Sequence, residues 1–178
     1  MEPETALREI VRRYLNVYGP STLRNFRYWW EAHPGPAKLA FNSLADEIEE
    51  VDVEGWHAMA LRARAPSMQE MEAAGVVHLL PMFDAYTLGL TRGEHLQRFI
   101  SQADQKKVFR TQGWVSAVVL VDGFIKGTWE YKPLRSSTSV KVNLFSPAAN
   151  GIREGVAVEA HRLGKFLNSP IALEFIQN

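Results

Sequence analysis

One pair of side chains in this sequence could take part in proton transfer. Asp84 and Tyr86, in the segment Phe83-Asp84-Ala85-Tyr86, could act as an acid and base pair. A short acidic side chain also often holds a turn by accepting backbone N–H groups, and the residues alone favour that structural role for Asp84.

Other catalytic and cofactor-binding patterns are absent from the sequence. It has no Gly-rich phosphate loop, no GxSxG motif and no dinucleotide fingerprint. The lack of cysteine excludes disulfides, thiolate zinc sites and a cysteine nucleophile. The histidines are scattered and form no metal-ligand motif; they are His33, His57, His78, His95 and His161. We therefore expect neither a metal nor a cofactor.

Charged side chains are balanced overall but unevenly distributed along the chain. Twenty Lys and Arg residues offset twenty Asp and Glu residues, so the net charge is zero. One short segment is acidic: Asp46, Glu47, Glu49, Glu50, Asp52 and Glu54. A later segment is basic, with Lys126 further on: Arg92, Arg98, Lys106, Lys107 and Arg110. This asymmetry is compatible with a polyanion partner for the second half, with docking of the halves on each other, and equally with two solvated surfaces.

Length and composition are those of an ordinary globular protein. The 178 residues predict one domain or two small ones, and 46% of them are hydrophobic. No apolar run approaches the eighteen residues expected of a membrane span. The acidic start of the chain is unlike a signal peptide. We therefore expect a cytoplasmic protein that makes no membrane contact.

The first part of the chain predicts three helices and a hairpin. Apolar residues recur at helical spacing over residues 7–18, 21–30 and 36–48, and an alternating pattern around Glu54-Gly55 predicts a hairpin over 51–61. We expect a winged helix-turn-helix in residues 1–65. Lys38, Asn42 and Ser43 would lie on the exposed face of its third helix and could read bases, or this face could be solvated or cover another part of a longer protein.

Residues 66–178 predict a second, β-rich unit with flanking helices. Capping boxes at Ser67 and Thr91 predict helices over 67–75 and 91–107, and Asp122-Gly123 predicts a tight hairpin. The predicted strands cover 76–80, 114–121, 124–129, 137–145 and 171–176, with a helix over 146–167. The fold class expected for the whole chain is α+β, with a small antiparallel β-barrel or curved sheet following the winged helix.

Three groups of motifs resemble the AlkZ-like (YcaQ-like) family of winged-helix DNA glycosylases, in the order and spacing of that family. The first group runs from Arg13-Tyr14-Leu15 through Tyr18-Gly19-Pro20 to Phe26 and Trp29-Trp30. The second is Leu79-Leu80-Pro81-Met82-Phe83-Asp84-Ala85-Tyr86-Thr87-Leu88-Gly89. The third comprises Gly113-Trp114, Val118-Val119-Leu120-Val121-Asp122-Gly123 and Gly127-Thr128-Trp129.

The resemblance implies tandem winged helices followed by a β-barrel, arranged around DNA, in proteins that excise alkylated or crosslinked bases. Family members are about twice this long, and the chain resembles their C-terminal half. Their catalytic Gln-x-Gln or Gln-x-Asp motif belongs to the N-terminal half, so Gln102-Ala103-Asp104 matches its letters but not its place. Asn25 stands where the family usually has Asp.

Three functions follow as hypotheses. The chain could be a DNA-binding module, with double-stranded DNA and possibly a missing N-terminal half as partners. It could be a self-contained glycosylase that uses Asp84, or Gln102 and Asp104, to orient water. It could also be a protein-interaction module whose acidic hairpin binds a basic partner. The basic segment and the unmatched catalytic motif favour the first, without catalysis by this chain alone.

Overall fold

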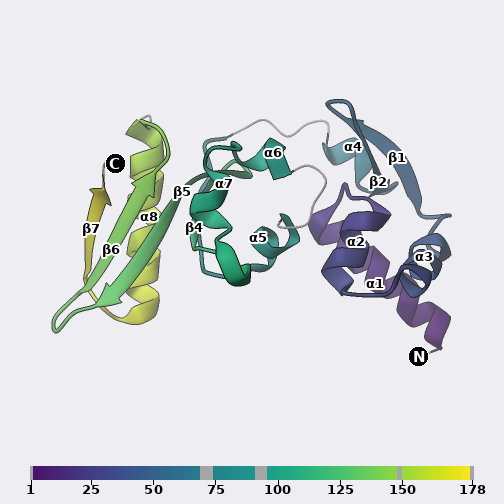
Figure 1. The fold of residues 1–178 in the computed structure, drawn as a ribbon, viewed down its shortest axis with the longest axis horizontal. Coiled ribbons are helices and arrows are strands. Elements are labelled where there is room, and N and C mark those ends of the chain that lie inside the picture. Colours follow the sequence, from purple (N-terminus) through teal and green to yellow (C-terminus); the bar gives the residue numbers. More distant parts are fainter. Residues whose placement is uncertain (1, 69–73, 91–95, 148–149, 177–178) are drawn as a thin grey trace. The chain divides into compact units, whose positions relative to one another are not determined.

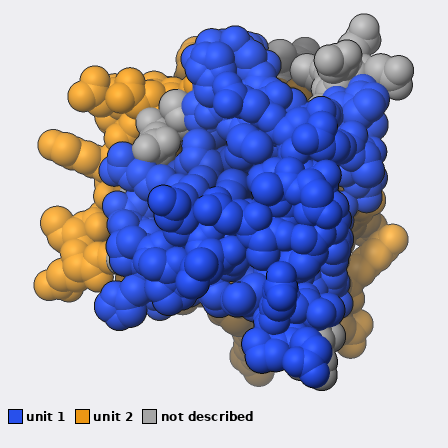
Figure 2. All heavy atoms as spheres, turned by 90° about the vertical axis from the view of Figure 1, so that its right-hand side faces the viewer, with its two compact units in different colours: residues 1–72, 92–94 blue, residues 73–91, 95–178 orange. Residues whose placement is uncertain are grey.

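The computed structural model describes residues 2–68, 74–90, 96–147 and 150–176 (Figure 1). Contacts within the backbone divide the chain into two compact units, residues 1–72 with 92–94 and residues 73–91 with 95–178 (Figure 2). The domain boundary that the sequence predicts between residues 65 and 66 stays a prediction.

Unit 1 consists of helices followed by a two-stranded hairpin. The helices are α1 (Pro3–Tyr18), α2 (Leu23–Trp30) and α3 (Pro34–Ser43); the strands are β1 (Ile48–Val53) and β2 (Trp56–Leu61), and α4 (Ala65–Met68) follows. Thr22, rather than Ser21, caps α2, because its side chain accepts the N–H of Asn25 at 3.2 Å. Ser21 instead exchanges two backbone hydrogen bonds with Met59 of β2.

Phe26 is the centre of the unit 1 core. Its side chain is fully buried, and its ring lies 5.1 Å from Tyr14, 5.4 Å from Trp30 and 5.7 Å from Phe41 between centroids. Trp29, in contrast, is partly exposed, as expected for one of two successive tryptophans on a helix. One ring thus joins α1, α2 and α3.

The third helix ends earlier than the sequence pattern predicts. Helical spacing of apolar residues continues to Ile48, but α3 ends at Ser43 and Ile48 begins β1. Ile48 is buried all the same, so its place in the core is compatible with either element. Ion pairs from α1 hold Asp46 and Glu47 in the intervening turn, and this tertiary contact overrides the local helical pattern.

Unit 2 contains a mixed five-stranded sheet in the order β3-β4-β5-β6-β7. The strands are β3 (Val77–Leu80), β4 (Val118–Val121), β5 (Phe124–Pro133), β6 (Thr138–Leu144) and β7 (Ile171–Ile176). Asp122 and Gly123 both have positive φ in the β4–β5 turn, which confirms the predicted hairpin.

The prediction of a purely antiparallel sheet is wrong at one edge. Strand β7 pairs with β6 in parallel, because the connection between them is the eighteen-residue helix α8 (Asn150–Leu167). A helical crossover carries the chain back to the end of the sheet at which β6 begins, so that β7 runs in the same direction as β6. Within the described residues β3 and β7 are the two edges and do not pair with each other, so the hydrogen-bonded order is that of an open sheet.

The two faces of this sheet are covered by different elements. On one face lies α8 (Figure 1), whose Val156 belongs to one buried cluster with Val119, Val121 and Val140. On the other face Val118 and Leu120 contact a second cluster that includes Val108. Successive residues of β4 therefore point to opposite faces of the sheet, and all four residues of this strand are buried.

Short helices replace the single helix predicted over residues 91–107. The structure has α6 (Leu96–Phe99) and α7 (Gln105–Val108), and residues 91–95 lie outside the described residues. Ser101 separates the two helices, because its hydroxyl accepts the N–H of Asp104 and its carbonyl accepts the N–H of Gln105. The predicted helix over 67–75 falls mostly on residues 69–73, which also lie outside the described residues.

Candidate functional site

Four basic side chains of unit 2 form what we call the basic surface: Lys106, Lys107, Arg110 and Lys126. The Lys107 ammonium lies 4.9 Å from the centre of the Phe145 ring, and the backbone N–H of Phe145 donates to the carbonyl of Lys126 at 2.9 Å. The Lys126 ammonium lies 5.2 Å from the ring of Phe124. The fold thus brings together Lys107 and Lys126, which are nineteen positions apart in sequence (126 − 107).

The segment that carries three of these cations is anchored in the core of unit 2. Val108 is fully buried, and its carbonyl accepts the N–H of Ser116 at 2.9 Å. The N–H of Arg110 donates to the carbonyl of Trp114 at 2.9 Å. The side chains of Lys106 and Arg110 are exposed and make no ion pair within the described part of the chain. Their positive charge therefore faces solvent from a fixed backbone.

The other two predicted basic residues are placed differently. Arg98 lies on α6, is partly buried and takes part in a further interaction. Arg92 lies outside the described residues. Only Lys106, Lys107, Arg110 and Lys126 can therefore be assigned to the basic surface.

Asp84 and Tyr86 are both engaged in holding the local fold. The Asp84 carboxylate accepts the N–H of Tyr86 at 2.8 Å, which is the contact that an N-cap residue makes, at the start of helix α5 (Ala85–Leu90). The Tyr86 hydroxyl donates to the carbonyl of Gly123 at 2.8 Å, and burial raises the Tyr86 pKa to about 12. This geometry ties α5 to the β4–β5 turn.

Gln102 and Asp104 lie in the turn between α6 and α7. Asp104 accepts hydrogen bonds from the Ser101 hydroxyl at 2.6 Å and from the Lys107 ammonium at 2.8 Å. These contacts lower the pKa of Asp104 below its ordinary value, and the contact with Lys107 has the largest effect. Gln102 is exposed on the same turn. The Asp104 carboxylate is thus engaged within the turn before α7, and it neutralises part of the Lys107 charge.

The predicted base-reading face of α3 is only partly available. Lys38 and Asn42 are exposed, but the Ser43 hydroxyl donates to the carbonyl of Ala40 at 2.6 Å. The Ser43 carbonyl also accepts a hydrogen bond from Arg8 of α1. Ser43 is thus turned back to the backbone, and whether Lys38 and Asn42 contact bases stays a prediction.

Two carboxylates of the acidic segment are neutralised by α1. Glu47 lies 2.7 Å from both Arg8 and Arg12, and Asp46 lies 2.9 Å from Arg8. On the hairpin, Glu50 of β1 lies 3.1 Å from His57 of β2. Glu49 of β1 lies 3.6 Å from Arg62, the residue that follows β2. The acidic segment therefore serves first to attach the α3–β1 turn to α1, while the hairpin keeps an acidic surface.

The ion pairs of Glu47 predict a pH dependence of stability. Hydrogen bonds from Arg12 and then Arg8 lower the Glu47 pKa from 4.5 to about 2 in the folded state. The contribution of these hydrogen bonds to the stability of unit 1 is therefore complete above about pH 4.5, and it is lost as the pH falls towards 2. We expect Glu47→Gln to lower the urea midpoint of unit 1 at pH 6.5. The difference in midpoint between this variant and the wild type should be smaller at pH 3. Glu4→Gln, at an exposed site, is the control. The same difference in midpoint between Glu47→Gln and the wild type at both pH values would contradict a stabilising role of the Glu47 ion pairs.

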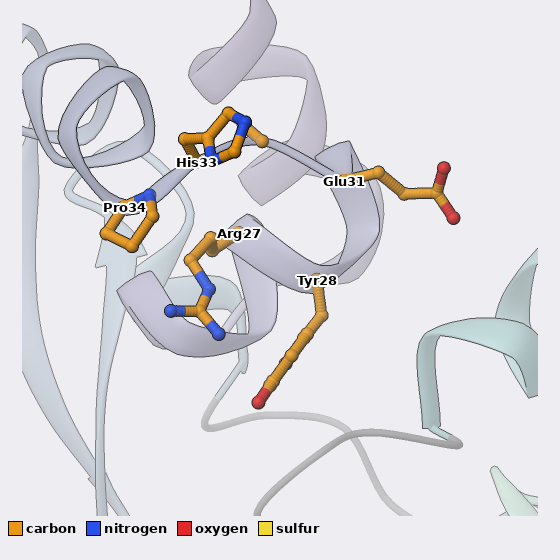
Figure 3. Close-up of a pocket in the computed structure, with 6 residues that line it drawn as sticks. Arg27, Tyr28, Glu31, His33 and Pro34 are labelled. Carbon is orange, nitrogen blue, oxygen red and sulfur yellow. The ribbon is translucent and has the colours of Figure 1, made fainter.

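A second basic cluster, on α2, did not emerge from the sequence reasoning. The Arg24 and Arg27 guanidinium carbons lie 5.7 Å and 4.7 Å from the centre of the Tyr28 ring. The pKa of Tyr28 is lowered, and the main cause is a side-chain hydrogen bond with Arg24. Arg27, Tyr28 and Glu31 are also among the residues that line a hollow of about 340 Å³ (Figure 3). The i, i+3 and i+4 spacing of Arg24, Arg27 and Tyr28 is the signal that could have revealed it.

Within the described residues, no group of three or more His, Asp or Glu side chains is arranged to hold a metal ion. No helix in the same residues is long and apolar enough to cross a membrane.

Comparison with known proteins identifies the family. A sequence model described as "DNA glycosylase AlkZ-like" matches residues 1–166. The chain belongs to the AlkZ-like DNA glycosylase family. It is 34% identical over 132 residues to an interstrand DNA cross-link repair glycosylase of Streptomyces sahachiroi, a match that covers 72% of this chain and 35% of that protein.

A solved structure supports the same assignment. The fold is similar to that of the Streptomyces sahachiroi DNA glycosylase AlkZ, with a TM-score of 0.81 and 27% identity over 99% of this chain and 47% of that chain. This chain thus spans about half the length of the solved AlkZ-like relative. The predicted resemblance to the family is confirmed, and so is the α+β fold class.

Several residues that carry the family resemblance have structural roles in unit 2. Asp84 caps α5, and the Trp129 indole N–H donates to the carbonyl of Leu80 at 2.8 Å. A Cβ at Gly127 would lie 2.5 Å from the carbonyl oxygen of Asn143, so only glycine fits there. These motif positions of the AlkZ-like family therefore maintain the sheet and its covering helices.

Proposed function

We propose that this chain is a DNA-binding part of an AlkZ-like glycosylase and contacts duplex DNA through the basic surface of unit 2. The basic surface is the single observation that carries the proposal. Cations on a fixed backbone recognise the regular spacing of phosphates without reading bases. The name of the similar Streptomyces protein, a cross-link repair glycosylase, supports a DNA-repair context.

Unit 1 we propose to be a winged helix. The chain order of α1, α2, α3 and a hairpin is that of such a domain, and the backbone pairing of Ser21 with Met59 adds a short third strand segment beside β2. Its hairpin is acidic, so we assign it a minor share of phosphate contact. Removal of a base we assign to a longer protein, since the catalytic glutamine motif implied by the resemblance has no counterpart at the matching place here.

Sequence-independent binding is the testable consequence of this assignment. Two duplexes of equal length and unrelated sequence should bind with dissociation constants within about threefold of each other, because phosphate contacts carry no sequence information. Fluorescence anisotropy at one low salt concentration measures this. A preference approaching the roughly 1,000-fold typical of specific proteins would contradict the proposal and point to Lys38 and Asn42 of α3, with Asn42→Ala as the check.

A further inference from the structure

Two large aromatic side chains of unit 2 contact each other at the surface instead of being buried. The rings of Phe83 and Trp114 lie 5.4 Å apart between centroids and meet edge to face, at 72°. Phe83 is 44% exposed and Trp114 is 42% exposed. Large aromatic residues contribute most when they are buried, so a pair left in solvent indicates a surface that a partner covers.

The backbone fixes this pair from two separate segments. Phe83 has a φ of 57°, a left-handed conformation that is uncommon for a bulky residue, and its N–H donates to the carbonyl of buried Val115 at 3.4 Å. On the other side, Gln112 and Gly113 also have positive φ, and the Trp114 carbonyl accepts the N–H of Arg110. Unusual backbone of this kind persists where surrounding contacts enforce it, often at ligand-binding sites.

The charges beside the pair define its partner. Arg110 is hydrogen-bonded to Trp114 through the backbone, and Lys106 lies on the same anchored segment; both side chains are exposed. A ligand that places a flat apolar group on the rings and negative charge beside them satisfies both features. An unstacked nucleotide has this combination, with a base that stacks on aromatic rings and phosphates that contact cations.

We propose that the Phe83–Trp114 pair is a stacking platform for an unpaired base of a DNA strand whose phosphates contact Arg110 and Lys106. The proposal rests on the proposed function and adds to it a preference for DNA with unpaired bases. It assigns Phe83 and Trp114 to binding and not to catalysis.

The test compares a fully paired duplex with the same duplex carrying a three-nucleotide bulge, by anisotropy on the full chain. The wild type should bind the bulged duplex about fivefold to 100-fold more tightly, the range that stacking of a base on an aromatic ring supports. Trp114→Leu, which keeps an apolar side chain without the indole, should remove this preference and leave binding to the paired duplex within twofold. Phe83→Asn, which removes the ring and suits a left-handed backbone, should do the same.

Controls separate this proposal from the one on which it rests. Phe166→Ala removes an 85% exposed aromatic side chain from α8 and should keep the preference. Equal binding of both duplexes by the wild type would overturn the platform and leave duplex binding intact. Equal weakening of both duplexes by Trp114→Leu, or a wild-type dimer in light scattering that this variant loses, would also overturn it. Binding of neither duplex would contradict the proposed function itself.

Discussion

Replacing Lys106 and Arg110 together with alanine should weaken binding to a paired duplex on the order of 100-fold at 50 mM salt. Each phosphate contact contributes about 0.9 to the slope of log K against log salt, so the loss of two contacts has a large effect when salt is dilute. Both side chains are exposed and make no ion pair within the described residues. Lys107 is omitted from the variant because Asp104 already pairs with it at 2.8 Å.

The control for this variant removes the same charge from the opposite face of the sheet. Arg153→Ala with Lys165→Ala changes two residues of α8 that make no ion pair within the described residues, and it should reduce affinity only slightly, through net charge. Thermal unfolding of both variants should stay close to that of the wild type, as is usual for surface substitutions. If the two double variants weakened binding equally, the basic surface would have no special role.

Phe26→Ala should destabilise unit 1 by about 3–5 kcal/mol, which is a large part of the stability of a small domain. The Phe26 side chain is fully buried between Tyr14, Trp30 and Phe41, so its removal leaves a cavity at the junction of α1, α2 and α3. Urea unfolding followed by far-ultraviolet circular dichroism measures the change.

A surface substitution in the same unit provides the reference. Leu39→Ala removes a side chain on α3 that is 69% exposed and should cost less than about 0.5 kcal/mol. A loss below about 1 kcal/mol for Phe26→Ala would mean that the three helices do not depend on this aromatic contact.

The helices and hairpins of this chain are largely predictable from the sequence. Helical periodicity locates α1 and α2, the alternation after Ser137 locates β6, and Asp122-Gly123 places the β4–β5 turn. The predicted terminal strand agrees with β7 at both ends. These are local features, and local residue patterns determine them.

Features that depend on distant contacts were not predictable in the same way. The end of α3 depends on Glu47 pairing with Arg12, thirty-five positions earlier in the chain. The parallel pairing of β7 with β6 depends on how α8 packs, since strand patterns carry no direction. Periodicity contains no information on either contact.

The candidate site was predictable by residue type but not by geometry. The run of positive charge identifies Lys106, Lys107 and Arg110, whereas the pairing of Lys107 with Asp104 requires the turn at Ser101. The contact between Phe83 and Trp114 joins residues thirty-one positions apart (114 − 83), and no residue pattern in the sequence indicates that these two side chains meet.

The salt dependence of duplex binding tests the central claim most directly. A random-sequence duplex should bind the wild-type chain with a slope of log K against log salt of about −3 to −4, which corresponds to phosphate contacts made by the side chains of the basic surface. Lys106→Ala with Arg110→Ala should make the slope shallower by about two, because it removes two of these contacts. A wild-type slope near zero, or an unchanged slope in this variant, would contradict DNA binding through the basic surface of unit 2.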